Sequence, residues 1–202
     1  MKRCCFFVGL LLAIPVSAQQ IDSNIFLYKD AGIQISKPAN WEFMSLDDYL
    51  EQKKKVDRKS KNFNDRVRMM KNIPVVTVVK KPEADEKVYT CVEFSIKDIS
   101  QLSDKDEIQV MDHLIMQFKK VLKDFTILNK THIVMISGVK ASELELSYTF
   151  TPAKNMSAKC HSRIIVWKKG CFLYQLALSY DAKPNPKSVE GLKQIVDNVK
   201  LF

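Results

Sequence analysis

Hydrophobic and polar residues alternate along much of the second half of the chain and in shorter stretches of the first half. Between residues 140 and 150, Leu144, Leu146 and Tyr148 occupy every second position, which is the period of a β-strand with one buried face. Clusters of turn-forming residues separate such stretches. The pattern predicts eight strands, over residues 25–28, 33–36, 75–79, 88–97, 126–137, 140–150, 160–168 and 171–180.

Two other stretches have the 3.6-residue period of helices with one apolar side. The first follows residues 103–106, which resemble a capping box. The second begins at Asn185 and Pro186, because proline is favoured in the first turn of a helix. The apolar positions are Ile108, Met111, Leu114, Ile115, Phe118, Val121, Leu122 and Phe125 in the first helix, and Val189, Leu192, Ile195, Val196 and Val199 in the second.

The order of these elements predicts the fold class. A strand pair and a helical segment at about 46–71 come first, followed by a half-buried strand pair, a helix, four strands and a closing helix. Helices placed between hairpins indicate an antiparallel β-sheet with helices packed on it, an α+β fold. Because a chain of 202 residues is below the size at which chains commonly divide, we expect a single domain over residues 19–202.

The first 18 residues have the layout of a secretory signal peptide. Lys2 and Arg3 precede an apolar run over residues 4–16, and the small residues Ser17 and Ala18 follow it. The run is too short for a membrane-spanning helix, which needs about 20 residues. We therefore expect cleavage after Ala18, no transmembrane segment in the mature chain, and an extracytoplasmic location, either periplasmic or secreted.

Positive charge is concentrated in residues 51–71. The whole chain has a formal charge of +9, and this segment contains nine basic and three acidic residues. Such a patch attracts anionic partners in a salt-dependent way; the alternative is a solvated segment that only aids solubility. The candidate contacts to an anionic partner are Lys53, Lys54, Lys55, Arg58, Lys59, Lys61, Arg66 and Arg68. Nucleic acid is not expected, because Phe63 is the one aromatic residue in the segment and stacking platforms need several.

Three cysteines remain after removal of the leader, namely Cys91, Cys160 and Cys171. A hairpin that turns at Lys169 and Gly170 would place Cys160 opposite Ser179, far from Cys171, so these two cannot form a disulfide with each other. A disulfide would use Cys91, with either Cys160 or Cys171. The alternative is three small thiols buried in the sheet, where free cysteine behaves as a small hydrophobic residue.

No catalytic or metal-binding motif is present in the sequence. His113, His132 and His161 have no Cys or His partner at zinc-ligand spacing, so we expect structural or surface roles for them and no metal or cofactor. Cys160 and His161 are neighbours on a strand and point to opposite faces, which disfavours a catalytic pair. Glu143 and Glu145 share a strand face and are able to flank a substrate, but an exposed sheet edge or turn explains them more simply.

The chain resembles a known family in its turn and core motifs. Residues 26–41 are FLYKDAGIQISKPANW, which resembles the Y-x-D-x-G-x-x-I-x-x-P-x-x-W start of PsbP-like proteins. The strand that follows residues 138–141, the hairpin at Lys169 and Gly170 and the ending at residues 199–202 are similar too. These domains share an α/β/α sandwich with DcrB-like bacterial envelope proteins and with a nuclear import factor that binds the small GTPase Ran.

The resemblance implies an α/β/α sandwich and a non-enzymatic binding or assembly role. The basic segment and the bacterial-style leader depart from the photosynthetic members, so no photosystem partner, manganese or calcium is carried over. Our hypothesis is an exported binding or assembly protein of the cell envelope, whose partner is an envelope or secreted protein, or an anionic glycan or lipid surface. The alternative is a small extracytoplasmic enzyme, a hydrolase or a thiol-dependent enzyme, with an unrecognised site.

Overall fold

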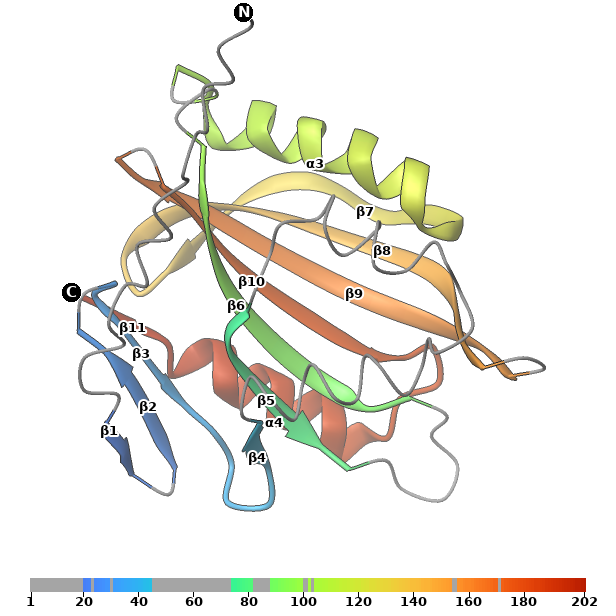
Figure 1. Cartoon of the computed structure of the whole chain (residues 1–202), viewed down its shortest axis with the longest axis horizontal. Helices are drawn as coiled ribbons and strands as arrows, with labels where there is room; N and C mark the ends of the chain where they lie inside the picture. The colour runs from blue at the N-terminus through green and yellow to red at the C-terminus, as the bar shows by residue number, and fades with distance from the viewer. Residues whose placement is uncertain are drawn as a thin grey trace, which may run out of the picture.

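Seven antiparallel strands form one large sheet in the computed structural model, which describes residues 20–22, 24–29, 31–44, 74–81, 88–99, 102, 104–153, 156–170 and 172–202 (Figure 1). The predicted signal peptide (1–18) and the predicted basic insertion (46–71) lie outside these residues. All eight predicted strands are present. In spatial order, the sheet consists of β4 (Glu42–Met44), β5 (Pro74–Lys80), β6 (Thr90–Asp98), β10 (Phe172–Asp181), β9 (Met156–Lys169), β8 (Val139–Ala153) and β7 (Lys123–Ile136).

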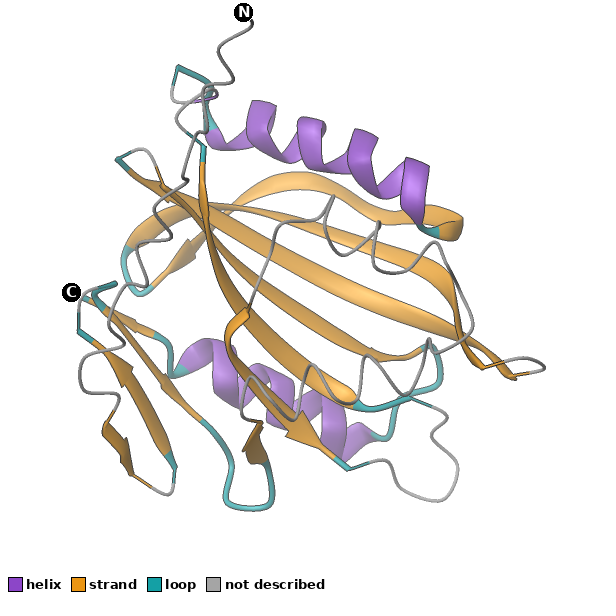
Figure 2. Ribbon diagram, viewed as in Figure 1, coloured by secondary structure: helices purple, strands orange, loops and turns teal. Residues whose placement is uncertain are grey.

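The two faces of the large sheet are covered by different helices, α3 (Glu107–Val121) and α4 (Pro186–Asp197) (Figure 2). Leu144 and Ile164 belong to the apolar cluster that includes α3, whereas Ile165 and Leu176 belong to the cluster that includes α4. Alternate residues of a strand therefore enter different cores, as the period of two requires. The predicted α+β class, an antiparallel sheet with helices packed on it, is confirmed.

Helix α3 starts and ends inside the predicted limits. Its N-cap is Asp106, whose side chain accepts a hydrogen bond from the Gln109 backbone N–H while the Gln109 side chain reaches back to the Asp106 N–H. The prediction of a box at 103–106 was therefore wrong in position. The inclusion of Phe125 was also wrong, because the chain leaves the helix after Val121 and begins β7 at Lys123.

Helix α4 begins where the sequence predicts. Asn185 is the N-cap and accepts a hydrogen bond from the Lys187 N–H, with Pro186 in the first turn. Its buried side includes Leu192 and Ile195, but Val189 is 44% exposed, so its predicted place on the apolar side was wrong. Gly191 takes that place and lies against the ring of Trp41.

A second, four-stranded sheet lies beside the first and contains β1 (Gln20–Asp22), β2 (Ile25–Tyr28), β3 (Ile33–Ser36) and β11 (Lys200–Leu201), in that order. The bounds of β2 and β3 agree with the prediction. Their turn needs Gly32, which has a φ of +65° and whose carbonyl accepts a hydrogen bond from the Phe202 N–H. A Cβ on Gly32 would lie 2.3 Å from the Phe202 carbonyl oxygen. Glycine therefore allows β11 to close this sheet.

The pair β5–β6 is more deeply buried than the sequence indicates. Val76 and Val78 pack in the core with α4, but Thr77 and Val79 on the other face of β5 are buried as well. The prediction of a half-buried pair was therefore wrong for β5, because a β-branched run does not reveal how many of its faces are covered. In the described parts of the chain, no helix combines the length and apolarity needed to cross a bilayer.

Candidate functional site: a polar sheet face

Six polar side chains from four adjacent strands gather on one face of the large sheet. Cross-strand partners point to the same side of a sheet, as do residues two apart on one strand. His132 is opposite Glu143, Glu145 is opposite Arg163, and His161 is opposite Tyr180. We call this group the polar sheet face: His132, Glu143, Glu145, His161, Arg163 and Tyr180. Glu143 is also opposite Ile165, which packs in the core with α4, so the group lies on the α4 side of the sheet.

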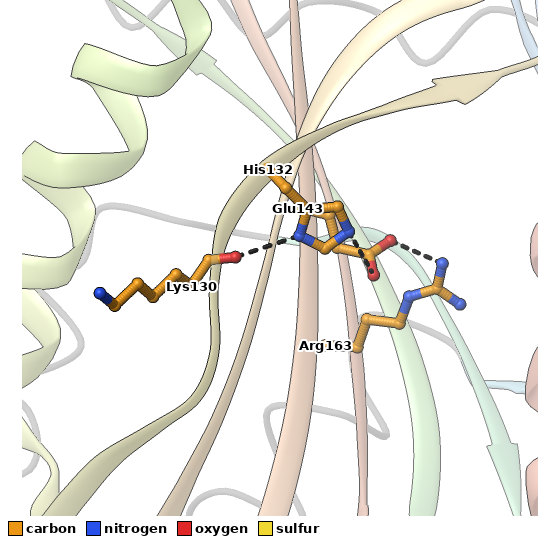
Figure 3. A network of polar contacts seen from close by, with 4 residues as sticks. All are labelled: Lys130, His132, Glu143 and Arg163. Carbon is orange, nitrogen blue, oxygen red and sulfur yellow. Dashed lines mark hydrogen bonds and ion pairs between the residues drawn. The ribbon is translucent and has the colours of Figure 1, made fainter.

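A buried ion pair lies at the centre of this face (Figure 3). Glu143 has a side chain only 5% exposed, and its Oε2 accepts a hydrogen bond from Nη2 of Arg163 at 2.6 Å. Arg163 keeps 32% of its side chain exposed, so the guanidinium joins the buried carboxylate to the surface. A charge-assisted bond this short fixes both side chains and connects β8 to β9.

His132 contacts the second oxygen of the same carboxylate. Its Nδ1 lies 3.1 Å from the backbone carbonyl oxygen of Lys130, and since a carbonyl only accepts, Nδ1 carries the proton and donates. The Nε2 atom lies 3.8 Å from Oε1 of Glu143. The Lys130 side chain extends away from the group (Figure 3). Glu143 is thus held between groups from β7 and β9.

The polar sheet face has hydrogen-bonding capacity that the described residues do not use. Within the described part of the chain, the Glu145 carboxylate has no hydrogen-bond or ion-pair partner. Nε of Arg163 and Oγ of Ser147, which is opposite His161, are buried without a partner. The rings of His161 and Tyr180 meet edge to face with centroids 5.8 Å apart. Burial, and then the charge of Glu145, raise the pKa of the Tyr180 hydroxyl, which therefore stays a donor.

The sequence predicts part of this arrangement. Glu143 and Glu145 do share a face, but the exposed-edge explanation was wrong for Glu143, which is buried between strands. His132 contacts this carboxylate, whereas His113 bonds to Gln117 on α3. Sequence analysis missed Arg163. The available signal was a charged residue directly before the apolar run Ile164–Trp167, a place where charge is rarely left unpaired.

The described cysteines do not form a catalytic pair with histidine. Cys91 is half-buried and Cys160 buried, neither is in a disulfide, and Cys171 lies outside the described residues. The expected register of the β9–β10 hairpin was wrong by two residues: Cys160 is opposite Asp181 rather than Ser179, because Lys169 pairs with Phe172 and the loop begins at Gly170. Burial, and then the charge of Asp181, raise the pKa of Cys160 to about 12. Cys160 is therefore a buried thiol rather than a nucleophile.

We expect Cys160 to resist alkylation in the folded protein. A thiol with a pKa of about 12 has almost no thiolate at mildly alkaline pH, and the thiolate is the reactive form. Iodoacetamide treatment followed by peptide mass spectrometry should leave Cys160 unmodified in the native protein. The same treatment in concentrated guanidinium chloride is the control and should modify it fully. Rapid modification of the native protein would contradict this placement of the thiol.

Lys97 on β6 should make stability depend on pH. Burial lowers the pKa of its ammonium from 10.5 to about 8, so between these values the unfolded chain binds the proton more firmly than the folded one. The free energy of unfolding therefore rises with pH, by about 1 kcal/mol from pH 8 to 9. Above pH 9 the raised pKa of Cys160 opposes this rise, because the folded state then binds the extra proton.

Urea unfolding at a series of pH values tests this expectation. The Lys97→Met variant should be more stable than the wild type at neutral pH and should lack the rise between pH 8 and 9. If the free energy of unfolding rose equally with pH in the two proteins, Lys97 would be excluded as the cause.

A cavity of about 310 Å³ lies between the two sheets, at the lower end of the size range of ligand pockets. Trp167 and Tyr174, stacked with centroids 5.6 Å apart, form one wall. Val139 and Leu201 line it as well, and Nζ of Lys169 donates to the Phe202 carbonyl oxygen at 3.4 Å beside it. The lining suits a small apolar group.

Metal ligands and the basic segment are the remaining candidate groups. Among the residues with described positions, no three His, Cys, Asp or Glu side chains come close enough to hold a metal ion. The candidate contacts of the basic segment all lie outside the described residues: Lys53, Lys54, Lys55, Arg58, Lys59, Lys61, Arg66 and Arg68.

Comparison with known proteins reveals similarity in structure but not in sequence. No protein-family model and no curated protein matches the sequence. The solution structure of cyanobacterial PsbP (CyanoP) from Synechocystis sp. PCC 6803 is similar, with a TM-score of 0.51 at 14% identity. The superposition includes 99% of this chain and 98% of CyanoP. The chain has a PsbP-like fold. LpqN of Mycobacterium tuberculosis, which is involved in cell envelope biogenesis, covers 84% of this chain and 83% of its own, with a TM-score of 0.51 at 15% identity.

The PsbP-like fold confirms the resemblance seen in the sequence at the level of architecture. At 14–15% identity a shared fold does not carry site residues from one protein to another. The function of the polar sheet face must therefore be argued from the side chains of this chain.

Proposed function

We propose that the protein is an exported, non-catalytic binding protein of the cell envelope. The observation that carries the proposal is the polar sheet face, in which the half-buried Glu145 carboxylate lies beside a fixed ion pair and has no hydrogen-bond or ion-pair partner among the described residues. Groups held rigidly by a sheet and left without protein partners are suited to recognition. The role of LpqN in cell envelope biogenesis supports an envelope location, as does the leader predicted from the sequence at residues 1–18.

The chemistry of the polar sheet face favours binding over catalysis. Its two carboxylates differ in role, since Glu143 is neutralised by Arg163 at 2.6 Å and only Glu145 is left as a charged acceptor. The Cys160 thiol is on the opposite face of β9 from His161 and has a raised pKa. The thiol-dependent alternative therefore receives no support from Cys160.

The basic segment supplies a second contact in this proposal. Its nine basic and three acidic residues account for most of the mature chain's positive charge, so an anionic partner in the envelope would be attracted to residues 51–71. The partner is an envelope or secreted protein, or an anionic glycan or lipid surface.

Capture from a native envelope fraction tests the proposal. The tagged mature protein is compared with a charge-reversed variant (Lys53, Lys54, Lys55, Arg58 and Lys59 to Glu) and with the double variant Glu145→Ala/Tyr180→Ala. Wild type should retain an envelope component, the charge-reversed variant should lose it in a salt-dependent manner, and the double variant should lose it at any salt concentration. Retention of the same material by all three proteins, or of none by the wild type, would contradict the proposal.

A further inference from the structure

We propose that one end of the molecule docks on an anionic lipid surface, an assignment that rests on the proposed binding function and names its partner. Three turns meet strand β11 at this end. Gly32 lies in the turn between β2 and β3, Gly138 in the turn between β7 and β8, and Gly170 in the turn between β9 and β10. We call this region the turn end.

Contacts between distant parts of the chain hold the turn end together. The Leu201 N–H donates to Oγ of Ser137 at 3.1 Å, and the Phe202 N–H donates to the Gly32 carbonyl oxygen at 3.0 Å. Nζ of Lys169 donates to the Phe202 carbonyl oxygen. The turn end therefore lies beside β11, at the left of Figure 1.

Apolar side chains are exposed at the turn end. Met135, two residues before Ser137, is 66% exposed, Phe202 is 63% exposed, and Phe172 at the start of β10 is exposed as well. Met135 and Phe202 are the two most exposed large apolar side chains of the described residues. Single exposed apolar residues are ordinary, but a group of them on neighbouring turns is typical of a contact with a partner or a membrane.

Four exposed lysines accompany these apolar side chains. Lys140 is directly opposite Met135 across the β7–β8 hairpin, and Lys169 is directly opposite Phe172 across the β9–β10 hairpin. Such cross-strand neighbours have their Cβ atoms about 5 Å apart. The other two lysines belong to the small sheet or its turn, and the full set is Lys29, Lys140, Lys169 and Lys200. Within the described part of the chain, none of the four forms an ion pair.

This combination of charge and apolar area favours an anionic bilayer. Asp98, opposite Phe172, and Asp30, in the first turn, offset part of the lysine charge, and a positive excess remains. Lysine suits a membrane interface, because its alkyl chain contacts the apolar region while the ammonium stays among the headgroups. Anionic headgroups attract the ammonium groups, and the exposed apolar side chains add the buried area on which stable membrane binding also depends.

The positions of the apolar side chains fit a surface that the strand ends approach directly. Met135 is on the α3 side of the large sheet, because its neighbour Ile136 belongs to the apolar cluster of α4. Phe172 is on the α4 side, because its neighbour Leu173 belongs to the cluster of α3. A partner lying flat on one face of the sheet would contact only one of them. A bilayer that meets the strand ends would receive both.

Vesicle flotation of the full mature protein tests the assignment. The anionic probe is a vesicle of phosphatidylglycerol and phosphatidylethanolamine in equal parts, and the neutral probe is a vesicle of phosphatidylcholine alone. We expect the wild type to float with the anionic vesicles and to bind the neutral ones at least about tenfold more weakly. Binding to the anionic vesicles should weaken as salt is added, because salt screens exposed charges.

Paired variants assign this binding to the turn end. Each variant removes either the apolar side chains or the lysines of the two hairpins and should weaken binding to the anionic vesicles at least about tenfold: Met135→Ser/Phe172→Ser and Lys140→Gln/Lys169→Gln. The matched controls remove the same number of exposed apolar or basic side chains from α3 and should bind as the wild type does: Ile108→Ser/Met116→Ser and Lys119→Gln/Lys120→Gln. Circular dichroism checks that each variant is folded.

A fluorescent reporter measures insertion directly. Met135→Trp should be quenched by anionic vesicles that contain brominated lipid, whereas Met116→Trp on α3 should not. The natural Trp41 and Trp167 are both 2% exposed, and the wild type measured in the same vesicles supplies their background. Equal quenching of the two reporters would contradict an approach through the turn end.

Other results would also overturn the assignment. Equal binding to neutral vesicles would remove the role of the lysines. Loss of vesicle binding only in the charge-reversed variant of residues 53–59 would assign the lipid contact to the basic segment. If no vesicle binds but the wild type still captures an envelope component, the lipid assignment falls while the binding function stands, with a protein or a glycan as partner. If capture fails as well, both proposals fall.

Discussion

Replacing Arg163 with Leu is expected to lower the free energy of unfolding by about 3 kcal/mol. The substitution removes the donor 2.6 Å from Oε2 of Glu143 and leaves a carboxylate that is 5% exposed without its main partner. Breaking a buried ion pair from one side costs about 3–5 kcal/mol. The lower end applies here, because Arg163 is 32% exposed and the pair is therefore partly solvated.

The structure provides a matched control for this experiment. Lys193 and Asp197 on α4 are joined at the same N···O distance of 2.6 Å, but their side chains are 66% and 55% exposed. Lys193→Leu should therefore cost less than about 1 kcal/mol. The double variant Glu143→Leu/Arg163→Leu should recover most of the lost stability, since a buried pair replaced by apolar residues is often neutral. Equal losses for Arg163→Leu and Lys193→Leu in urea unfolding would show that burial does not control the strength of the pair.

Gly191→Ala should destabilise the protein by about 2 kcal/mol although alanine is the better helix former. An added Cβ would lie 2.7–2.8 Å from three ring atoms of Trp41, which is 2% exposed and has no room to move outward. Overpacking a core costs about 1–3 kcal/mol, and the upper end applies because three ring atoms would be closer than 3.0 Å; the helix propensity gained is at most about 1 kcal/mol. The packing cost therefore exceeds the gain in helix propensity, and the net effect is destabilising.

A second substitution separates packing from propensity. Trp41→Phe removes the part of the ring that Gly191 faces, so Gly191→Ala should cost less in that background than in the wild type. Thermal unfolding of the four proteins gives the coupling between the two positions. A stabilising Gly191→Ala in the wild type would contradict the close contact.

Local signals in the sequence predict local structure well. Asn185 and Pro186 predict the start of α4, and the turn at Gly32 predicts β2 and β3 with their bounds, because caps and turns are decided by a few neighbouring residues. The short strands β1, β4 and β11 were not predicted. Each has two or three residues, too few to show a period. Strands β4 and β11 form because strands distant in the sequence, β5 and β3, offer hydrogen bonds, whereas β1 pairs with the adjacent β2.

The candidate site is harder to predict because it depends on register. Glu143 meets Arg163 only if β8 and β9 pair with Glu145 opposite Arg163, and no local feature of either strand determines that alignment. The error at Cys160 has the same origin, since shifting the loop from Lys169–Gly170 to a start at Gly170 moves every partner along β10 by two residues. The two-residue period of a strand predicts which residues share a face. The loops set the register, and so determine which residues are opposite each other on neighbouring strands.

The small sheet also affects the order of folding. Strand β3 pairs with β11, with Gln34 opposite Lys200. Nearly the whole chain must therefore be brought together before these hydrogen bonds form. Contacts between such distant residues slow folding, because the intervening chain loses entropy before the contact stabilises it. Because β2 and β3 are neighbours in the sequence, their hairpin is expected to form before β11 pairs with β3. The last interactions to form would be those that join Gly32 to Phe202.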